Sequence, residues 1–572
     1  MHYPLLFLAE TAGIRLDRLD WIIVALYAVA VLAIGLLVVR KPESSESYFL
    51  AGRSLRWPFI GASLFAANIS AEHFVGLAGG GFAFGLALGA WEWSAVFGLA
   101  PLVVLFLPFY IRNKIYTVPE FLERRFGPPV RLTFSLFMIA LAVLAKISIS
   151  LYASSLVLAP VLGIGKIQVI WLIGFITAVY TMKGGLKAVV YTDALQSVIL
   201  VIAGGILLCK GLEAVGWWPG LKEKLAGISH ADGYDYLGMM QSAKHRDVPW
   251  FGMTVTTVIV GSFYWSMDQV LVQRVFAAKD LNEGRLGATF CAFLKLATPF
   301  LLILPGIIAL VLHRDGKLAL ETNPATGAVI NDSAYPALLA KLMPHGLLGL
   351  TVAGITAALM GHLSATYNSV ATLVTRDIYL KFKPDAGHDR QIVVGRIAVL
   401  AVFILGALWA PLLARSNAMF QYLQSVQCYM MIPFAFVFFL GVFWKRTTSA
   451  GVLACVVSAV VVSTLFIANA DRMDEAERAG RTVTSFVPWM DNPYLRPFTH
   501  SALVSGLISL AVLIGVSLAT KPEDPSKLAT TTIGGADAAL PAEPAPALSR
   551  DYRLWYGLAA ACAAGLWAWF SF

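Results

Sequence analysis

The stretch YFLAGRSLRWPFIGASLFAANISAEHFVGLAGGG, residues 48–81, begins as a membrane helix and then becomes too polar to continue as one. It is apolar from Trp57 to Phe65, and four polar side chains then fall at membrane depth: Asn68, Ser70, Glu72 and His73. Such groups are costly in lipid and are tolerated where a broken helix surrounds a solute or an ion, as in secondary transporters. The alternative is a polar patch at a contact between two helices, with the glycines of residues 76–81 allowing close packing.

The composition agrees with a protein that lies mostly in lipid. Of the 572 residues, 58% are hydrophobic and 13% are charged, whereas soluble domains have about 45–50% apolar and about 25% charged residues. The five cysteines lie in or beside apolar segments without the spacing of metal ligands or of a disulfide framework. The net charge of +9 is distributed over loops and does not indicate a nucleic-acid partner.

About fourteen apolar stretches are long enough to cross a bilayer, so the sequence predicts an all-α polytopic membrane protein. They are residues 20–39, 57–79, 84–110, 131–160, 167–181, 193–210, 250–273, 287–312, 346–374, 392–413, 418–441, 449–469, 500–519 and 553–571. With the N-terminus outside, the loops that face the cytoplasm contain more than half of the 43 Lys and Arg residues. We therefore expect a multi-pass protein of the cell (inner) membrane with both termini outside.

Several motifs, in chain order, resemble the sodium/solute symporter family, in particular its sodium/glucose cotransporter branch. They are GASLFAANISAEHFVGLAGGG (61–81), YTMKGGLKAVVYTDALQ (180–196), YWSMDQVLVQRVFAAK (264–279), FQYLQS (420–425) and FFLGVFWKR (438–446). The resemblance covers nearly the whole chain and implies a core of ten helices in two five-helix halves of inverted topology. The first helix of each half would be broken, and polar residues interrupt both 68–73 and 261–268.

This architecture divides the chain into seven regions. They are an N-terminal helix with a cytoplasmic loop (1–56), the first half (57–210), an extracytoplasmic loop (211–249), the second half (250–441), peripheral helices (442–519), a flexible cytoplasmic linker rich in Ala, Thr and Pro (520–552) and a C-terminal helix (553–572).

The resemblance also implies a pocket for a monosaccharide such as glucose or galactose. Sugar hydroxyls both donate and accept hydrogen bonds, and the apolar face of a sugar packs on a flat ring, so the pocket needs mixed polar groups and aromatics. When the roles of the family's motif residues are carried over to the matching positions of this sequence, the substrate-binding residues are His73, Glu92, Lys295, Gln424 and Tyr264. Tyr264 also resembles an inner gate, and Leu77, Trp91 and Phe420 resemble an outer gate. The alternative for Glu92 and Lys295 is a structural ion pair with each other or with Lys146.

The implied sodium site departs most from the family pattern. Sodium prefers hard oxygen ligands, and the resemblance implies the backbone carbonyls of Ala66, Ile69 and Ala358 together with two adjacent hydroxyl side chains. Gly361 and His362 stand where those hydroxyls are expected, so both side-chain oxygens are missing. Asp193 resembles an aspartate on the inner ion path of the family.

Three interpretations of His362 stay open. Its imidazolium takes the place of the cation, so that transport is coupled to protons; it is a fixed substitute in an uncoupled transporter or sugar sensor; or it is a packed histidine and sodium binds elsewhere. We expect a symporter that moves a monosaccharide into the cell with sodium by alternating access, with proton-coupled or sodium-independent transport as alternatives. A membrane enzyme using Glu92, His73 and Asp193 would lack a nucleophile motif, metal cluster or nucleotide loop, so we predict neither enzymatic activity nor a cofactor.

Overall fold

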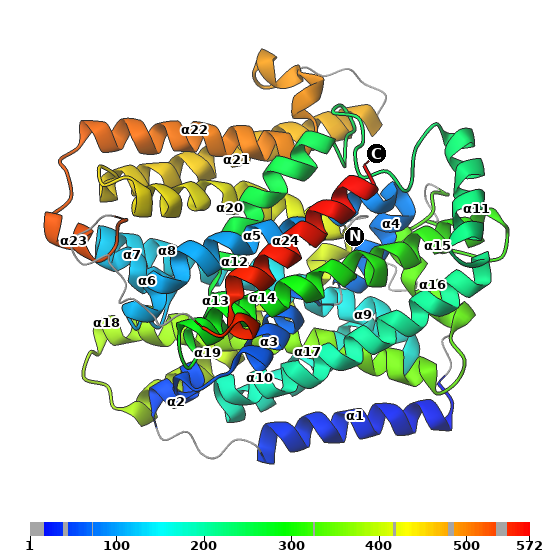
Figure 1. Ribbon diagram of the computed structural model, residues 1–572, viewed down its shortest axis with the longest axis horizontal. Helices are drawn as coiled ribbons and strands as arrows, with labels where there is room; N and C mark the ends of the chain where they lie inside the picture. The colour runs from blue at the N-terminus through cyan, green and yellow to red at the C-terminus, as the bar shows by residue number, and fades with distance from the viewer. Residues whose placement is uncertain are drawn as a thin grey trace, which may run out of the picture.

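The computed structural model describes residues 16–37, 44–70, 72–323, 327–415, 419–478, 485–533 and 546–571. Within these ranges the regular structure is helical, apart from two isolated bridging pairs. Most helices lie side by side and run along the long axis of the view in Figure 1. The predicted all-α fold is therefore confirmed.

Nine helices of the described chain are long and apolar enough to cross a membrane. They are His73–Arg112, Pro128–Leu162, Gly185–Val215, Leu281–Arg314, Leu347–Phe382, His388–Leu412, Leu423–Phe443, Ser449–Asp474 and Phe498–Ala519. The structure contains five further segments that are shorter or interrupted. They are α1 (Arg18–Leu37), α3 (Trp57–Asn68), the first part of α10 (Lys166–Val215), α12 with α13 (Thr257–Met267 and Gln269–Phe276) and α24 (Tyr552–Trp569). Together these segments account for the number of spans expected from the sequence.

Two of the long helices bend at glycines with a left-handed backbone. Gly85 (φ 65°) follows α4 (Ala78–Phe84), and Gly185 (φ 57°) bends α10. A Cβ on Gly185 would lie 2.6 Å from the Tyr48 carbonyl oxygen, so both the backbone conformation and the close approach require glycine. This bend divides α10 into two helices, residues 166–184 and 185–215, which correspond to the two predicted spans 167–181 and 193–210.

The helix α17 (Leu347–Leu373) packs between α10 and α3, and most of its residues are buried. The helix α1 covers α10 and α17, at the edge of the bundle opposite to α21 (Ser449–Arg478) and α22 (Phe498–Ala519) in Figure 1. The C-terminal helix α24 crosses α14 (Leu281–Thr298) and α5 (Ala90–Ala100). This arrangement surrounds α17 and α3 with other helices, so their polar side chains face protein.

The expected loop 211–249 contains a helix, α11 (Trp217–Asp232). Leu221 and Leu225 lie four residues apart on one face of α11, and both are buried. An amphipathic helix therefore packs on the bundle within the region between the two predicted halves.

The expected flexible linker 520–552 is also partly folded. It contains the short helix α23 (Pro525–Ala529), which Asp524 caps by accepting from Ser526 N at 2.9 Å. The Ile533 backbone N–H donates to Val442 O at 3.0 Å. Part of the expected linker therefore has local helical structure and a backbone contact with α20 (Met419–Phe443). Its flexibility stays a prediction, and residues 534–545 lie outside the described ranges.

Candidate solute and ion sites

The helix that carries the polar stretch breaks after Asn68, as predicted. Ile69 is extended (φ −90°, ψ 126°), and helical structure resumes in a π-helical turn that begins at His73. The Asn68 amide is held from two other helices, because its Oδ1 accepts from Lys295 Nζ at 2.6 Å and its Nδ2 donates to Tyr264 Oη at 3.2 Å. A helix end of this kind leaves carbonyl groups without helical partners, and these groups are available to an ion or to a polar side chain.

A second helix, α12, breaks at Asp268 (φ −76°, ψ 118°). Asp268 Oδ1 caps the following helix α13 by accepting from Val270 N at 2.9 Å. Its Oδ2 contacts the ammonium group of Lys146, which lies on the helix Pro128–Leu162. Each of the two breaks is therefore stabilised by a polar or charged side chain from elsewhere in the bundle.

A cavity of about 60 Å³ lies beside the two breaks. The structure brings all five predicted substrate-binding residues to its wall: His73, Glu92, Tyr264, Lys295 and Gln424. They come from five helical segments, and their roles in binding stay predictions. A cavity of this size has room for a few water molecules, so a larger solute requires the lining side chains to move apart.

Other lining residues were not assigned to the site from the sequence. Those with polar or aromatic side chains are Asn68, Glu72, Ser94, Lys146, Thr257, Trp265 and Gln427. For Glu72 the signal was present, because an ionisable side chain at membrane depth marks a functional site by default. Thr257 and Gln427 carry no such signal, since uncharged polar residues are common at ordinary contacts between membrane helices.

Three ion pairs, each with both side chains at most 4% exposed, join helices in the core: Lys295 with Glu92, Lys146 with Asp268, and Arg274 with Asp193. The first two include residues of the cavity wall, and the third does not. The first is the structural pair considered as an alternative above, and Lys146 takes Asp268 as its partner instead. Glu72 Oε2 accepts a hydrogen bond from Ser150 Oγ at 3.0 Å. Removing one member of a buried pair leaves an uncompensated charge, at a cost of about 3–5 kcal/mol.

The predicted gates lie in different surroundings. Leu77 is fully buried in the core. Trp91 lines the cavity and stacks on Phe498 of α22, with ring centroids 6.4 Å apart and planes 5° apart. The Tyr264 ring lines the cavity, with Lys146 Nζ 5.3 Å from its centroid. Phe420 belongs to α20 (Met419–Phe443), but its side chain lies outside the described part of the chain.

His362 reaches from α17 to the broken helix α3. Its Nδ1 lies 2.6 Å from the carbonyl oxygen of Ala67. A Cβ on the adjacent Gly361 would lie 2.5 Å from Gln196 Oε1 and 3.3 Å from Asp193 Oδ1, both on α10. Gly361 and His362, which stand where the two hydroxyls are expected, therefore lie between α3 and α10. The His362 ring contacts α3, and Gly361 faces α10.

The predicted carbonyl ligands belong to residues that the structure buries completely: Ala66, Ile69 and Ala358. Their part in binding an ion stays a prediction. Asp193 is engaged by its neighbours, since its Oδ2 accepts from Ser63 Oγ at 2.5 Å and lies 3.3 Å from Arg274 Nη2. Arg274 Nε also donates to Ser63 Oγ at 2.8 Å. The observed role of Asp193 is thus that of a counter-charge to Arg274, and its place on an ion path stays a prediction.

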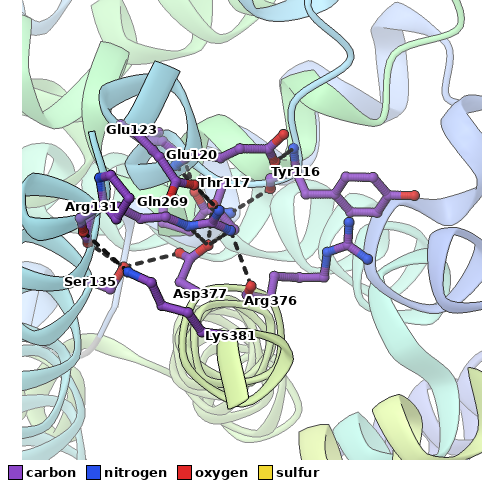
Figure 2. Close-up of polar contacts among 12 residues, drawn as sticks. Tyr116, Thr117, Glu120, Glu123, Arg131, Ser135, Gln269, Arg376, Asp377 and Lys381 are labelled. Carbon is purple, nitrogen blue, oxygen red and sulfur yellow. Dashed lines mark hydrogen bonds and ion pairs between the residues drawn. The ribbon is translucent and has the colours of Figure 1, made fainter. Parts of the chain in front are cut away.

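A second polar cluster, the Asp377 cluster, lies where α17 ends (Figure 2). Asp377 Oδ1 accepts from Arg131 Nε at 2.9 Å, from Arg131 Nη2 at 2.5 Å and from Thr117 Oγ1 at 2.8 Å. Asp377 Oδ2 accepts from Ser135 Oγ at 3.1 Å. Arg131 and Ser135 lie on α8 (Pro128–Leu141), and Thr117 caps α7 (Val118–Phe126), so a single buried carboxylate ties the end of α17 to α8 and to the start of α7.

Comparison with known proteins agrees with this architecture. The profile of the sodium:solute symporter family matches residues 48–458. The chain is 34% identical over 540 residues to the sodium/myo-inositol cotransporter 2 of Sus scrofa, covering 89% of this chain and 77% of the relative. It is 34% identical over 545 residues to the sodium/glucose cotransporter 4 of Mus musculus, covering 91% and 78%.

Among solved structures, the fold is similar to that of a Na⁺-coupled sialic acid symporter in a substrate-bound, outward-open state. The TM-score is 0.73 at 21% identity, over 88% of this chain and 99% of that chain. This similarity shows a shared fold. The profile match and the relatives extend over most of the sequence. The chain is therefore a member of the sodium:solute symporter family.

Proposed function

We propose that this chain carries a small polyhydroxylated solute, an inositol or a monosaccharide, into the cell together with sodium by alternating access. Its family is one of solute symporters, and the relatives described above are named for myo-inositol and glucose. The observation that carries the proposal is the buried cavity, whose wall combines charged, amide and imidazole groups with aromatic rings. Hydroxyl groups need donors and acceptors together, and such a wall supplies both.

The lining residues take different parts in this proposal. Glu92 accepts hydrogen bonds, Lys295 donates them, and His73 and Gln424 do either. The Tyr264 ring packs on the apolar face of the solute. Lys295 and Glu92 contact each other in this structure. A bound solute exchanges that contact for hydroxyl partners, so both buried charges keep hydrogen bonds before and after binding.

Transport in this proposal is a rocking of residues 57–210 against residues 250–441 around the cavity. Trp91, with Leu77 and Phe420, closes the cavity toward the outside, and Tyr264 closes it toward the cytoplasm. The broken helices α3 and α12 line the cavity from the two halves, which supports a site at their interface.

One observation favours sodium-independent or proton-coupled transport as a second candidate. Sodium prefers oxygen ligands, whereas Gly361 offers no side-chain oxygen and the ring of His362 already contacts Ala67 O at 2.6 Å. In this second candidate the same solute moves while His362 occupies the position expected for the ion.

Uptake of radiolabelled myo-inositol and D-glucose into proteoliposomes tests the function and separates the two candidates. The vesicles receive an inward sodium gradient, an inward choline gradient or an acidic exterior, and protein-free vesicles are the control. One sodium ion entering down 100 mV contributes about 2.3 kcal/mol, which corresponds to roughly fifty-fold accumulation of a neutral solute. We expect accumulation of at least one solute with sodium. Uptake driven by acid but indifferent to sodium favours the second candidate, and no uptake in any buffer contradicts both.

A further inference from the structure

One ring nitrogen of His362 contacts a backbone carbonyl group, and the other has no hydrogen-bond partner in the part of the chain that the structure describes. The side chain is 3% exposed, and its Nδ1 lies 2.6 Å from Ala67 O. Nε2 is buried and has no hydrogen-bond partner among the described residues. Most buried polar atoms in proteins are hydrogen-bonded, so an unpaired nitrogen at this depth calls for an explanation.

The contact with Ala67 determines what Nε2 offers. A carbonyl oxygen only accepts, so Nδ1 carries the hydrogen, and in the neutral ring Nε2 then has a free lone pair. His362 lines the same cavity as Glu92, Lys295 and Gln424. This lone pair can accept a hydrogen bond, and a hydroxyl group of a solute in that cavity can donate one.

Two other buried atoms near this position also have no partner among the described residues. They are Asp193 Oδ1 and Gln196 Oε1. Both face Gly361 from α10, and neither Asp193 nor Gln196 belongs to the cavity wall. Of these three unpaired atoms, His362 Nε2 is thus the one that belongs to a residue of the cavity wall.

We propose that His362 is a solute-binding residue: its Nε2 accepts a hydrogen bond from one hydroxyl of the polyol while its Nδ1–H fastens α17 to the break in α3. This inference rests on the proposed function and adds to it a residue that recognises one particular hydroxyl. Ala67 and His362 belong to the two predicted halves of the core. A solute that engages Nε2 therefore binds a ring that already bridges those halves.

Two isosteric substitutions separate the two nitrogens. His362→Asn places an amide near the position of Nδ1, so it keeps a donor for Ala67 O and removes the group at Nε2. His362→Gln extends an amide to the position of Nε2, so it keeps an acceptor for the solute and removes the donor to Ala67 O. A third variant, His362→Ser, reaches neither position and replaces His362→Asn if that variant does not fold.

The measurement is binding to the purified full-length chain by titration calorimetry, with thermal unfolding of each variant as the folding control. The probes are myo-inositol and D-glucose, followed by the complete set of monodeoxy analogues of whichever probe binds. In the wild type, we expect one analogue to bind roughly fivefold or more weakly than the others, because it lacks the hydroxyl that donates to Nε2. His362→Asn binds the parent solute more weakly and no longer distinguishes that analogue, whereas His362→Gln keeps the distinction and unfolds at a lower temperature.

Two results overturn the inference, and they are distinguishable. If the wild type binds a probe but His362→Asn or His362→Ser retains the full discrimination between analogues, His362 does not contact the solute and the proposed function stands. If the wild type binds neither myo-inositol nor D-glucose, the proposed function fails and the role of His362 fails with it.

Discussion

Lys295 and Glu92 place two opposite charges where the solute is proposed to bind. Their side chains are 1% and 4% exposed, and Lys295 also donates to Asn68 Oδ1 at 2.6 Å. A buried ion pair is weak evidence for stability, because the cost of desolvation cancels much of the attraction. We therefore interpret the pair as two hydrogen-bonding groups that partner each other until a solute replaces the contact.

Substitution of both residues separates a structural pair from a solute site. Lys295→Met leaves the Glu92 carboxylate buried and unpaired, and we expect it to destabilise the fold by about 3 kcal/mol. Lys295→Met combined with Glu92→Gln removes both charges, so it regains most of this stability but still weakens solute binding by more than about 1 kcal/mol. Thermal unfolding and binding of myo-inositol or D-glucose are measured on the same samples. A double variant that binds like the wild type shows that the pair is only structural.

At the scale of helices, α5 and α12 cross with backbone against backbone beside the cavity. A Cβ on Gly98 would lie 2.7 Å from the carbonyl carbon of Gly261. Small residues at such a crossing allow membrane helices to approach closely. This approach brings Glu92 of α5 and Tyr264 of α12 to the same cavity wall.

Gly98→Ala forces α5 away from α12, because the neighbouring atoms are backbone and have no rotamer to change. We expect a loss of stability of about 1–3 kcal/mol, together with weaker solute binding. Gly205→Ala is the matched control, since nothing lies within 4 Å of a Cβ there, and the change inside α10 is neutral or stabilising by about 0.5–1 kcal/mol. Equal effects of the two substitutions on the unfolding temperature would show that the crossing of α5 and α12 tolerates a side chain.

The Asp377 cluster is the corresponding contact at the end of α17. Asp377→Asn keeps the shape of the side chain but removes the charge that Arg131 contacts, so we expect a loss of about 1.5–3 kcal/mol. Hydrogen exchange should increase in residues 374–382 and 128–135, because the end of α17 separates from α8. The control is Arg124→Gln, whose exposed contact with Glu120 at 2.8 Å contributes less than about 1 kcal/mol. Unchanged exchange in Asp377→Asn rules out a fastening role for the cluster.

At the scale of the whole molecule, the two ends of the bundle carry different connections. The short helices α7 (Val118–Phe126), α18 (Leu380–Phe382) and α23 lie at one end in Figure 1, and α11 and α16 (Ala334–Leu342) lie at the other. The first end is rich in Arg and Lys, and basic loops stay in the cytoplasm. We therefore propose that α7, α18 and α23 face the cytoplasm.

Cysteine labelling in intact cells checks this orientation. Cys209 and Cys562, the exposed cysteines of the described chain, are first replaced by serine. Lys317→Cys, near α11, should then react with a membrane-impermeant maleimide from outside, whereas Lys383→Cys, just after α18, should react only after the cells are opened. The reverse pattern contradicts the proposed orientation and leaves the fold unaffected.

Sequence alone determined the helices, the two interruptions and the family. An apolar stretch of membrane length becomes a helix because its backbone has no other partner in lipid, and polar side chains such as Asn68 and Asp268 end it locally. Both effects are local, because they depend on residues that are close together in the sequence. The motifs that resembled the sodium/solute symporter family also contain three of the five predicted substrate-binding residues that line the cavity: His73, Tyr264 and Gln424.

Only the tertiary structure decided which buried groups meet. Lys146 and Asp268 are 122 positions apart in the chain, and His362 and Ala67 are 295 positions apart. A charge at membrane depth indicates that a partner exists, but several opposite charges were available to Lys146 and no local pattern chooses among them. The unpaired Nε2 of His362 likewise depends on the ring being held by Ala67. Such contacts follow from helix packing, because packing sets the distances between side chains that the sequence keeps far apart.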